Sequence, residues 1–383
     1  YVYNTALTSP VCSQIVGEGG LVSILKPGAS VTTGLGVGAS GPTVLADFQV
    51  IGTSVPTGTG IYLGTGANYG THMRGVRVHD YTGAGGIGLR CGTILKTLIE
   101  RVTTQDCLIG LLVRTPSGAF PTTLRFDSCS FTGSSIRPTY GALINSGYGI
   151  QFVNCGFESA ANEGLMIEDA TSGLDAIDIS IGDGCWFEDN NSVTGTNGYH
   201  LSAISTAAKV IRLFVADCSF AIGTAGRAQR AVKISGATVG YNLRNLRLST
   251  ERNAETISIQ SGASGRVDEW PSYLNYGDNV VVDGTSFDQG PWGKNGTIHL
   301  PSAPTVASAT TITLGLNPLT FVSGTTAIST INIPWAGAAN YGGQLTVIPT
   351  GAWTLNTAGN IAVAATAVVN RAMTLTYEKA TAK

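Results

Sequence analysis

The sequence predicts an all-β protein, a right-handed parallel β-helix with three strands per coil that is followed by a small C-terminal β-sandwich. Three observations indicate this fold: a Cys-x-aromatic motif recurs at a nearly constant spacing, two further strand-like segments follow each copy, and Gly accounts for 51 of the 383 residues. A period of about 20–50 residues is typical of stacked solenoids. Glycine-rich turns between short strands suit the tight corners of such coils.

The motif marks one inward-facing position in every coil. It occurs as Cys129-Ser130-Phe131, Cys155-Gly156-Phe157, Cys185-Trp186-Phe187 and Cys218-Ser219-Phe220, and the cysteines are 26, 30 and 33 residues apart. The same position is expected to continue upstream as Val102, Val76 and Val50, and downstream as Leu246. Side chains two residues apart share one face of a strand, so the cysteine and the aromatic residue both point inward. We therefore expect roughly eight coils in register.

Each repeat contains two more segments with the composition of strands. The second strand of a coil is expected at Ile87–Leu89, Leu111–Val113, Ala142–Ile144, Leu165–Ile167, His200–Ser202, Val232–Ile234 and Ile257–Ile259. The third is expected just before the next motif, as in Ala176–Ile181 and Val210–Val215. Three short strands per repeat predict a solenoid with three faces.

Seven cysteines are present, and four of them occupy the repeated core position. Equivalent positions in adjacent coils lie about 4.8 Å apart, so these cysteines are expected to be buried and reduced, without disulfides among them. The sequence contains no Cys-x-x-Cys pair, and none of these cysteines has a histidine at ligand spacing. We therefore expect neither a metal site nor a cofactor.

The composition argues against several classes of partner. The formal net charge is −2, and 12% of the residues are charged, so the chain lacks the basic field that attracts nucleic acid or acidic membranes. No apolar run approaches the roughly 18 residues that a membrane helix needs, and we expect no membrane insertion. The chain begins at Tyr1 without a methionine, which leads us to expect that an N-terminal part is missing.

The sequence pattern changes once along the chain. We expect the β-helix over residues 1–280, a linker rich in Pro, Gly and Asn over 281–307, and the sandwich over 308–383. Seven short alternating strands at roughly ten-residue spacing predict the sandwich. Such a module would cap the last coil, whose unpaired strands otherwise invite aggregation.

The sequence resembles the tailspikes of bacteriophages, which combine a pectate-lyase-like β-helix with a small β-rich module. Ile15–Gly20 looks like the first-coil turn of such helices, and Gly342–Val347 through Asn370–Tyr377 is similar to the terminal module of phage fibres and spikes. The resemblance implies a homotrimer of the virion that binds, and often degrades, a bacterial capsule, O-antigen or exopolysaccharide at the host surface. It also implies attachment to the phage tail or baseplate through the missing N-terminal region. The matching motifs carry no catalytic residues.

The residues themselves point to a pair of carboxylates. The position after the inward aromatic faces outward, and down the stack it is His79, Gln105, Thr132, Glu158, Glu188, Ala221 and Ser249. Glu158 and Glu188 therefore occupy adjacent coils, about 4.8 Å apart at Cα. Such a pair fits the carboxyl separations of retaining or inverting glycosidases, and two like charges raise one pKa as a general acid requires. The alternative is two solvated glutamates on a surface ladder.

Loop lengths predict a notch around this pair. The Cys155 coil has a short loop between two coils with longer ones, so Glu158 and Glu163 are expected at the floor of the notch. The expected binding residues around it are Arg137 and Tyr140 on one wall, Asp189, Tyr199 and His200 on the other, and Trp186 as a sugar-stacking platform or subunit contact. Glu168 and Asp169 form a rival carboxylate group on the second edge, near Arg114 and Asn145.

Three functions remain open at this point. An endo-acting glycan hydrolase fits the carboxylates of the notch. A polysaccharide lyase that acts by β-elimination on a uronate-containing glycan needs a base and a cation, and the candidates are His79, Tyr140 or His200 as base and Arg137 or Arg114 as cation. A non-catalytic adhesin or fibre would hold the same glycan without cutting it.

Overall fold

The computed structural model describes residues 1–9, 13–19, 22–38, 41–53, 57–64, 68–115, 121–168, 176–190, 199–206, 210–221, 230–236, 238–249, 255–259, 263–268, 279–282, 286–289, 297–299, 305–314, 319–332 and 343–377. Within these residues the regular secondary structure is β-strand, as predicted. None of them forms a helix long and apolar enough to cross a membrane. The chain divides into two compact units, Tyr1–His299 and Leu300–Lys383.

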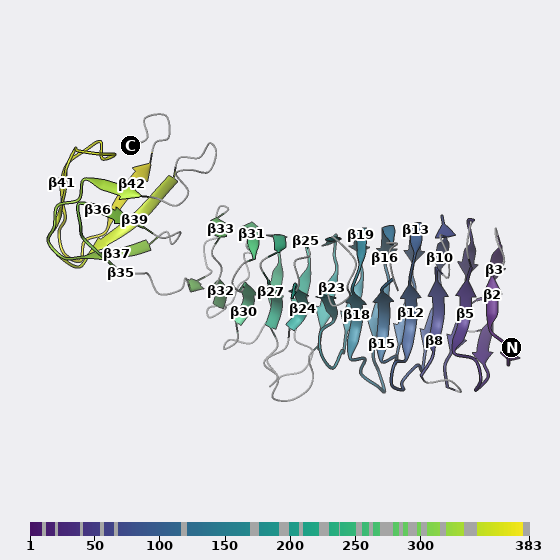
Figure 1. Cartoon of the computed structure of the whole chain (residues 1–383). Helices are drawn as coiled ribbons and strands as arrows, with labels where there is room; N and C mark the ends of the chain where they lie inside the picture. The colour runs from purple at the N-terminus through teal and green to yellow at the C-terminus, as the bar shows by residue number, and fades with distance from the viewer. Residues whose placement is uncertain are drawn as a thin grey trace. The chain divides into compact units, whose positions relative to one another are not determined.

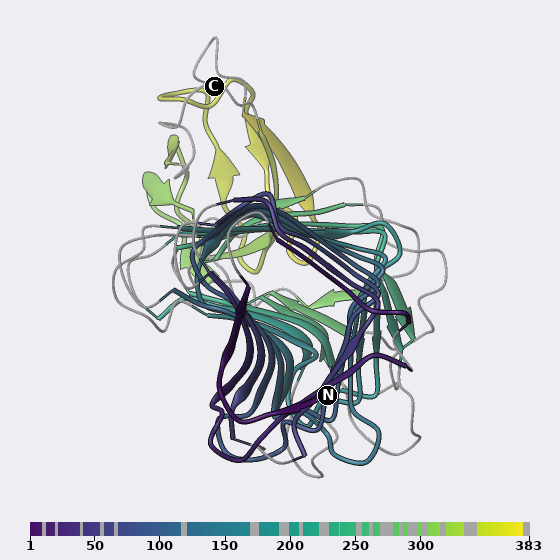
Figure 2. The same ribbon diagram turned by 90° about the vertical axis from the view of Figure 1, so that its right-hand side faces the viewer.

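The first unit is the predicted parallel β-helix, in which three sheets are built from strands of successive coils (Figures 1 and 2). The first sheet has the order β1 (Val2–Tyr3), β4 (Ile24–Pro27), β7 (Gln49–Ile51), β11 (Arg77–His79), β14 (Thr103–Gln105), β17 (Ser130–Thr132), β20 (Gly156–Glu158), β23 (Trp186–Glu188), β26 (Ser219–Ala221) and β29 (Arg247–Ser249). The second sheet has the order β2 (Leu7–Ser9), β5 (Thr33–Val37), β8 (Thr59–Leu63), β12 (Ile87–Cys91), β15 (Ile109–Val113), β18 (Tyr140–Ile144), β21 (Leu165–Glu168), β24 (Tyr199–Ile204), β27 (Arg230–Ser235), β30 (Glu255–Ile259), β32 (Asn279–Val282) and β34 (Thr297–His299).

The third sheet completes each coil before the chain returns to the first. Its order is β3 (Gln14–Val16), β6 (Val44–Ala46), β10 (His72–Arg74), β13 (Ile94–Glu100), β16 (Thr122–Asp127), β19 (Gly147–Val153), β22 (Ala176–Gly182), β25 (Val210–Ala216), β28 (Val239–Arg244), β31 (Ser264–Asp268) and β33 (Ser286–Gln289), with β9 (Asn68–Tyr69) beside β13. Neighbouring strands run parallel, as in the pairs β20–β23, β21–β24 and β22–β25.

The Cys-x-aromatic motifs form a ladder in the first sheet, as predicted, with each cysteine directly before its strand. The backbone N–H of Trp186 donates to the carbonyl of Cys155 at 2.9 Å, and that of Ser219 donates to Cys185 at 2.9 Å. Each motif is therefore in register with the motif one coil before it. This register fixes which side chains of the first sheet face the core and which face solvent.

The upstream end of the predicted ladder is wrong by two residues. Val50 pairs with Val78, which is the aromatic position of its coil. The residue one coil before Val76 is Phe48, whose carbonyl accepts the N–H of Arg77. The spacing of this coil is 28 residues (76 − 48), whereas the extrapolation used 26. A shift of two residues keeps the same face of the strand inside, so the core pattern alone could not detect it.

Phenylalanine rings stack along the core two residues after the cysteines. Phe131, Phe157, Phe187 and Phe220 are fully buried. Their successive ring centroids lie 5.3, 4.7 and 4.7 Å apart. The last two separations equal the strand spacing of a sheet, so one ring is repeated in each coil. This stack packs behind the strands that carry Glu158 and Glu188 and holds them in place.

The cysteines are core side chains. The six that the structure describes are free and buried, and the four stacked ones contain no disulfide, as predicted. Burial raises the pKa of Cys107 to about 12, and it also raises the pKa of Cys91. These thiols stay protonated at neutral pH and are unreactive there.

Residues in the left-handed region turn the chain at both ends of the first sheet. Before its strands, φ lies between 45° and 56° at Arg101, Ser128, Asn154, Asp183, Asp217 and Asn245. After them, φ lies between 49° and 67° at Asp80, Asp106, Ser159 and Asp189. Asn and Asp tolerate this region better than most residues because their short side chains form local hydrogen bonds. The corners limit these strands to three residues and place polar side chains along both edges of the sheet.

The second unit consists of small sheets. The largest has the order β35 (Thr305–Ala307), β37 (Leu319–Ser323), β39 (Gly343–Pro349) and β42 (Met373–Tyr377), and the two smaller ones pair β36 (Thr311–Thr313) with β38 (Thr330–Asn332) and β40 (Thr354–Leu355) with β41 (Ala365–Thr366). β35, β37 and β39 run parallel, whereas β42 runs antiparallel to β39. Parallel pairing distinguishes this unit from the antiparallel hairpins of most β-sandwiches. Its core surrounds the buried Trp353.

Candidate functional site

Glu158 and Glu188 are direct partners in the first sheet. Glu158 ends β20 and Glu188 ends β23, and the two residues are opposite each other in the register of these parallel strands. Gly156 and Trp186 are partners in the same way two residues earlier. Because alternate residues of a strand share one face, these four residues form one outward-facing group around the buried Phe157 and Phe187. We refer to it as the Glu158–Glu188 site.

Both carboxyl groups of this site lie over the outer face of the first sheet. The indole N–H of Trp186 donates to Glu188 Oε2 at 2.9 Å. A Cβ atom at position 156 would lie 3.1 Å from Glu158 Oε1, so the carboxyl of Glu158 folds back over the space that Gly156 leaves open. Trp186 is 40% exposed. The site therefore combines two carboxyl groups with an indole ring that is accessible to a ligand.

The environment makes the two carboxyl groups unequal. Burial raises the pKa of Glu158, and the neighbouring charge of Glu188 raises it further. Both effects act in the same direction, because burial and a nearby negative charge each favour the protonated form of a carboxyl group. Glu158 is therefore suited to donate a proton, while Glu188 is oriented by the hydrogen bond from Trp186.

An ion pair bridges the coil that carries Glu158. Arg137 Nη2 lies 2.8 Å from Asp189 Oδ2, and Arg137 Nη1 donates to the carbonyl oxygen of Asp189 at 3.2 Å. The two residues belong to the coils on either side of Glu158. Their contact links these two coils at the edge of the first sheet.

Asp106 holds the loop from which Arg137 projects. Its Oδ1 accepts the backbone N–H groups of Ser134, Ser135 and Ile136 at 2.7, 3.0 and 3.0 Å. Burial acts to raise the pKa of Asp106, but these hydrogen bonds outweigh it and lower the pKa. A carboxylate that accepts several N–H groups fixes the backbone around it. Asp106 therefore positions Arg137 without facing a ligand itself, a role that the sequence did not reveal.

Glu163 and Tyr140 contact the second sheet. The hydroxyl of Ser202 in β24 donates to Glu163 Oε1 at 3.2 Å. Burial raises the pKa of Glu163. Burial, followed by the charge of Glu163, also raises the pKa of Tyr140. Glu163 and Tyr140 therefore influence each other at the second sheet, and Ser202 is a hydrogen-bond donor to Glu163.

His200 and Tyr199 do not form a wall of the notch, which corrects the expectation for both. His200 is 1% exposed, and its Nδ1 lies 3.1 Å from Asn190 Nδ2. Burial lowers the pKa of His200 to about 3, so the imidazole stays neutral within the core. Tyr199 is also buried, and its hydroxyl accepts a hydrogen bond from Arg230 at 2.8 Å. Loop lengths placed His200 on the wall of the notch, but its ring lies in the core, 6.1 Å from the buried ring of Phe220.

The rival carboxylate on the second edge has a local partner. Asn145 Nδ2 lies 3.3 Å from Glu168 Oε1, as the stacking of these two positions predicted. Arg114 is exposed one coil before Asn145. Asp169, the second member of this group, lies outside the described residues. Across the described ranges, no three His, Cys, Asp or Glu side chains gather as a metal site would require.

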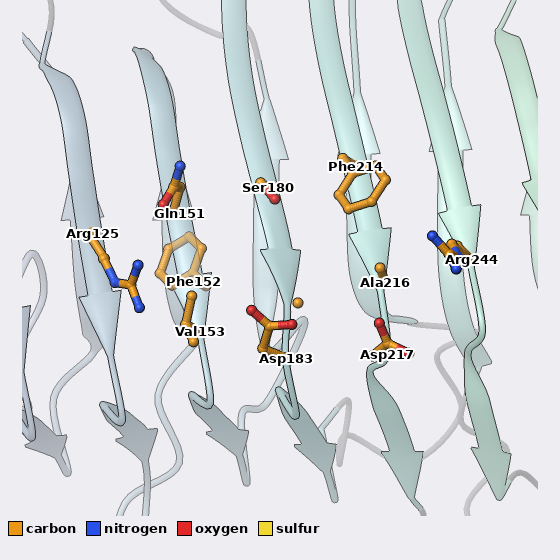
Figure 3. Close-up of a pocket in the computed structure, with 11 residues that line it drawn as sticks. Arg125, Gln151, Phe152, Val153, Ser180, Asp183, Phe214, Ala216, Asp217 and Arg244 are labelled. Atoms are coloured by element: carbon orange, nitrogen blue, oxygen red, sulfur yellow. The ribbon is translucent and has the colours of Figure 1, made fainter.

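A pocket that the sequence did not predict lies on the outer face of the third sheet. Its volume is about 340 Å³, and Figure 3 shows a row of side chains from successive strands: Arg125, Gln151, Ser180, Asp183, Phe214, Asp217 and Arg244. A signal was present, because Asp183 and Asp217 both come just before a stacked cysteine. Their corner position was not recognised, since turn residues lack the inward and outward alternation that identified Glu158 and Glu188.

A scan of protein-family models and a search of curated proteins found no match to this chain. Among solved structures, it is similar to the catalytic domain of a GH87 alpha-1,3-glucanase in complex with tetrasaccharides, with a TM-score of 0.43 and 12% identity over 76% of this chain. The match spans 63% of that domain. The tailspike of E. coli bacteriophage HK620 in complex with a pentasaccharide matches 90% of this chain and 74% of its own length, with a TM-score of 0.36 and 11% identity.

DFA-IIIase from Arthrobacter chlorophenolicus, in complex with DFA-III, is a third similar structure. Its TM-score is 0.34 and its identity is 10%, over 70% of this chain and 82% of its own length. Likenesses of this strength do not carry an activity from one chain to another. The function is therefore derived from the side chains of this protein.

Proposed function

We propose that this protein is a phage tailspike that binds a bacterial surface polysaccharide and hydrolyses it within the chain. The observation that carries the proposal is the Glu158–Glu188 site: two carboxyl groups on adjacent coils, a raised pKa on Glu158, and the exposed indole of Trp186 beside them. A pair of carboxyl groups, one of which has a raised pKa and acts as the general acid, forms the catalytic centre of most glycosidases. The phage origin rests on the sequence resemblance.

The two glutamates have distinct roles in this proposal. Glu158 protonates the glycosidic oxygen while Glu188 attacks the anomeric carbon, so that a glycosyl ester forms as the bond to the leaving sugar breaks. Water then attacks the same carbon, gives its proton to Glu158 and releases Glu188. Adjacent strands are about 4.8 Å apart, so the flexible glutamate side chains can bring their carboxyl groups to the roughly 5–5.5 Å separation of retaining enzymes. Trp186 supports one sugar ring next to the bond that is cut.

The lyase alternative receives less support from the same residues. His200 is buried and neutral, and His79 is held between Asp80 and Gln49 at 3.0 and 3.1 Å. The pKa of Tyr140 is raised, which makes its hydroxyl harder to ionise as a base. Arg137 is engaged by Asp189. A lyase would release unsaturated uronates that absorb ultraviolet light, and a hydrolase would not.

The experiment that tests the function is a halo assay of the purified protein on a panel of encapsulated bacterial strains. We expect clear halos on a few strains, followed by loss of viscosity of the purified polysaccharide of those strains and release of reducing ends. Ultraviolet-absorbing products would show that the protein is a lyase and not a hydrolase. Binding of labelled protein to cells, without halos or loss of viscosity, would show that it is a non-catalytic adhesin.

Hydrolysis is expected to decline as the pH rises through the pKa of Glu158, because the general acid must carry its proton. Burial and the charge of Glu188 both raise this pKa above the ordinary value of about 4.3 for Glu, so the midpoint of the decline lies above that pH. The pH profile of kcat/KM measures it. In Glu188→Gln, NMR titration of the Glu158 carboxyl should give a lower pKa, since one of the two causes is gone. An unchanged Glu158 titration in that variant would contradict the coupling.

The functional assembly is proposed to be a homotrimer. Val363, Val368 and Val369 of the second unit are 74%, 55% and 45% exposed, which is a large apolar surface for a small unit. Three copies about one axis would bury it, as cyclic symmetry allows. Light scattering is expected to give three times the chain mass of 39.4 kDa. A mass of one chain that persists across protein concentrations would rule the trimer out.

A further inference from the structure

We infer that the pocket of Figure 3 is a saccharide subsite, and that the glycan runs from it across the first sheet to Glu188, transverse to the β-helix axis. The inference that the pocket binds a saccharide rests only on the geometry of the pocket. The direction of the bound chain rests on the proposed function, because it takes the Glu158–Glu188 site as the place of cleavage.

The pocket is built from consecutive coils. Arg125, Gln151, Ser180 and Phe214 are successive partners on the outer face of the third sheet, in β16, β19, β22 and β25. Asp183 and Asp217 follow at the corner that leads to the first sheet. Figure 3 shows Arg125 and Arg244 at the two ends of the row, with the two aspartates between them. The row therefore offers donors, acceptors and a ring along one line.

The aromatic ring is the first sign of a ligand. Phe214 is 39% exposed on the outer face of the third sheet, in a pocket whose lining includes six polar or charged residues. An exposed aromatic residue in a polar pocket is typical of a ligand contact. One face of a sugar ring presents C–H groups, which pack against such a ring and remove it from water.

The polar groups fit hydroxyl-rich ligands better than anions. Asp183 and Asp217 accept hydrogen bonds, Arg125 and Arg244 donate them, and Gln151 and Ser180 do both. The two aspartates and two arginines balance in charge, so a phosphate or a polyanion gains no net attraction. Arg125 Nη2 is held 2.9 Å from Asp127 Oδ2, and Asn245 Nδ2 donates to Asp217 Oδ1 at 2.6 Å. These contacts orient the pocket before a ligand binds.

The pocket and the catalytic pair are close because the first sheet is narrow. Asp183 and Glu188 belong to one coil and are five residues apart, which spans at most about 18 Å of extended chain. Trp186 lies between them and faces outward from β23. A glycan laid along this coil would therefore contact Asp183 and Phe214 at one end, the Trp186 indole in the middle, and Glu188 at the other end.

The test measures binding as a function of glycan length. The probes are sized oligosaccharides made by partial acid hydrolysis of purified polysaccharide from a strain that the labelled protein binds, and calorimetry gives their Kd. Phe214→Ala and the double variant Asp183→Asn with Asp217→Asn are expected to weaken binding of the longest probes at least about tenfold, as loss of one aromatic stacking contact does. The shortest probes that still bind should be unaffected. Phe214→Tyr should bind like the unchanged protein.

The matched control is Val210→Ala, which removes an exposed apolar side chain from the same strand, β25, outside the pocket. Kd values of Phe214→Ala and of the aspartate double variant that equal those of Val210→Ala at every probe length would overturn the subsite. Equal weakening of short and long probes would overturn the transverse path, because the pocket would then not be an extension of the site. Weakened long-probe binding together with full hydrolysis by Glu158→Gln would keep the subsite and reject the proposed function.

Discussion

Replacing Glu158 by Gln is expected to lower depolymerisation by at least about 10²–10⁴-fold, because Gln has the same shape but cannot donate the proton that the leaving oxygen needs. Glu188→Gln should lose as much, since an amide cannot attack the anomeric carbon. Folding and glycan binding should persist in both variants, because the Phe157 and Phe187 rings behind them are unchanged. Viscosity loss and reducing-end release measure the activity, and calorimetry with the intact polysaccharide measures binding.

Glu168→Gln is the matched control for these variants. It makes the same chemical change in the same coil, but on the second sheet, where Asn145 is the partner of the carboxyl group. Asp169→Asn accompanies it as the other carboxylate of that edge. Activity that survives in both first-sheet variants and disappears in the control pair would move the catalytic site to the second edge. Full activity in all four variants would show that these carboxylates are solvated surface groups without a catalytic role.

Phe187→Ala is expected to lower the free energy of unfolding by about 3–5 kcal/mol, the range for removing a fully buried phenyl ring. Phe187 stacks at 4.7 Å on Phe157 and at 4.7 Å on Phe220, so its loss leaves a cavity between two rings that rigid strands hold apart. The neighbouring coils cannot collapse into this space without breaking their ladder hydrogen bonds. Denaturant unfolding followed by circular dichroism measures the change.

Phe214→Ala provides the comparison, because it removes the same ring from the outer face of the β-helix. Its effect on the free energy of unfolding should be within about 0.5 kcal/mol, as for most surface substitutions. If the two variants lose equal stability, the stacked rings do not hold the coils together. A loss in Phe187→Ala of less than about 1 kcal/mol would show that the core repacks around the cavity.

The repeat could be predicted from the sequence because the strand pairing between coils depends on the number of residues in each coil. Strands of a β-helix are short, and each position stacks on its equivalent one coil away, so a motif such as Cys-x-Phe marks the register directly. This was enough to place Glu158 opposite Glu188 and Trp186 opposite Gly156. It failed at Val50, because this coil is 28 residues long and Phe48, not Val50, is the equivalent of Val76.

By itself, the amino-acid sequence determined the three-sheet coil, the stacked thiols and the carboxylate pair. The tertiary structure decided which groups around the pair can meet a ligand: it buried His200, engaged Arg137 with Asp189, and set Asp183 near Phe214 in a pocket. The physical reason is that the two kinds of feature depend on interactions of different range along the chain. Alternation along a strand and stacking between coils repeat at fixed spacings, whereas the contacts of corner and loop side chains depend on distances between coils that no local pattern encodes.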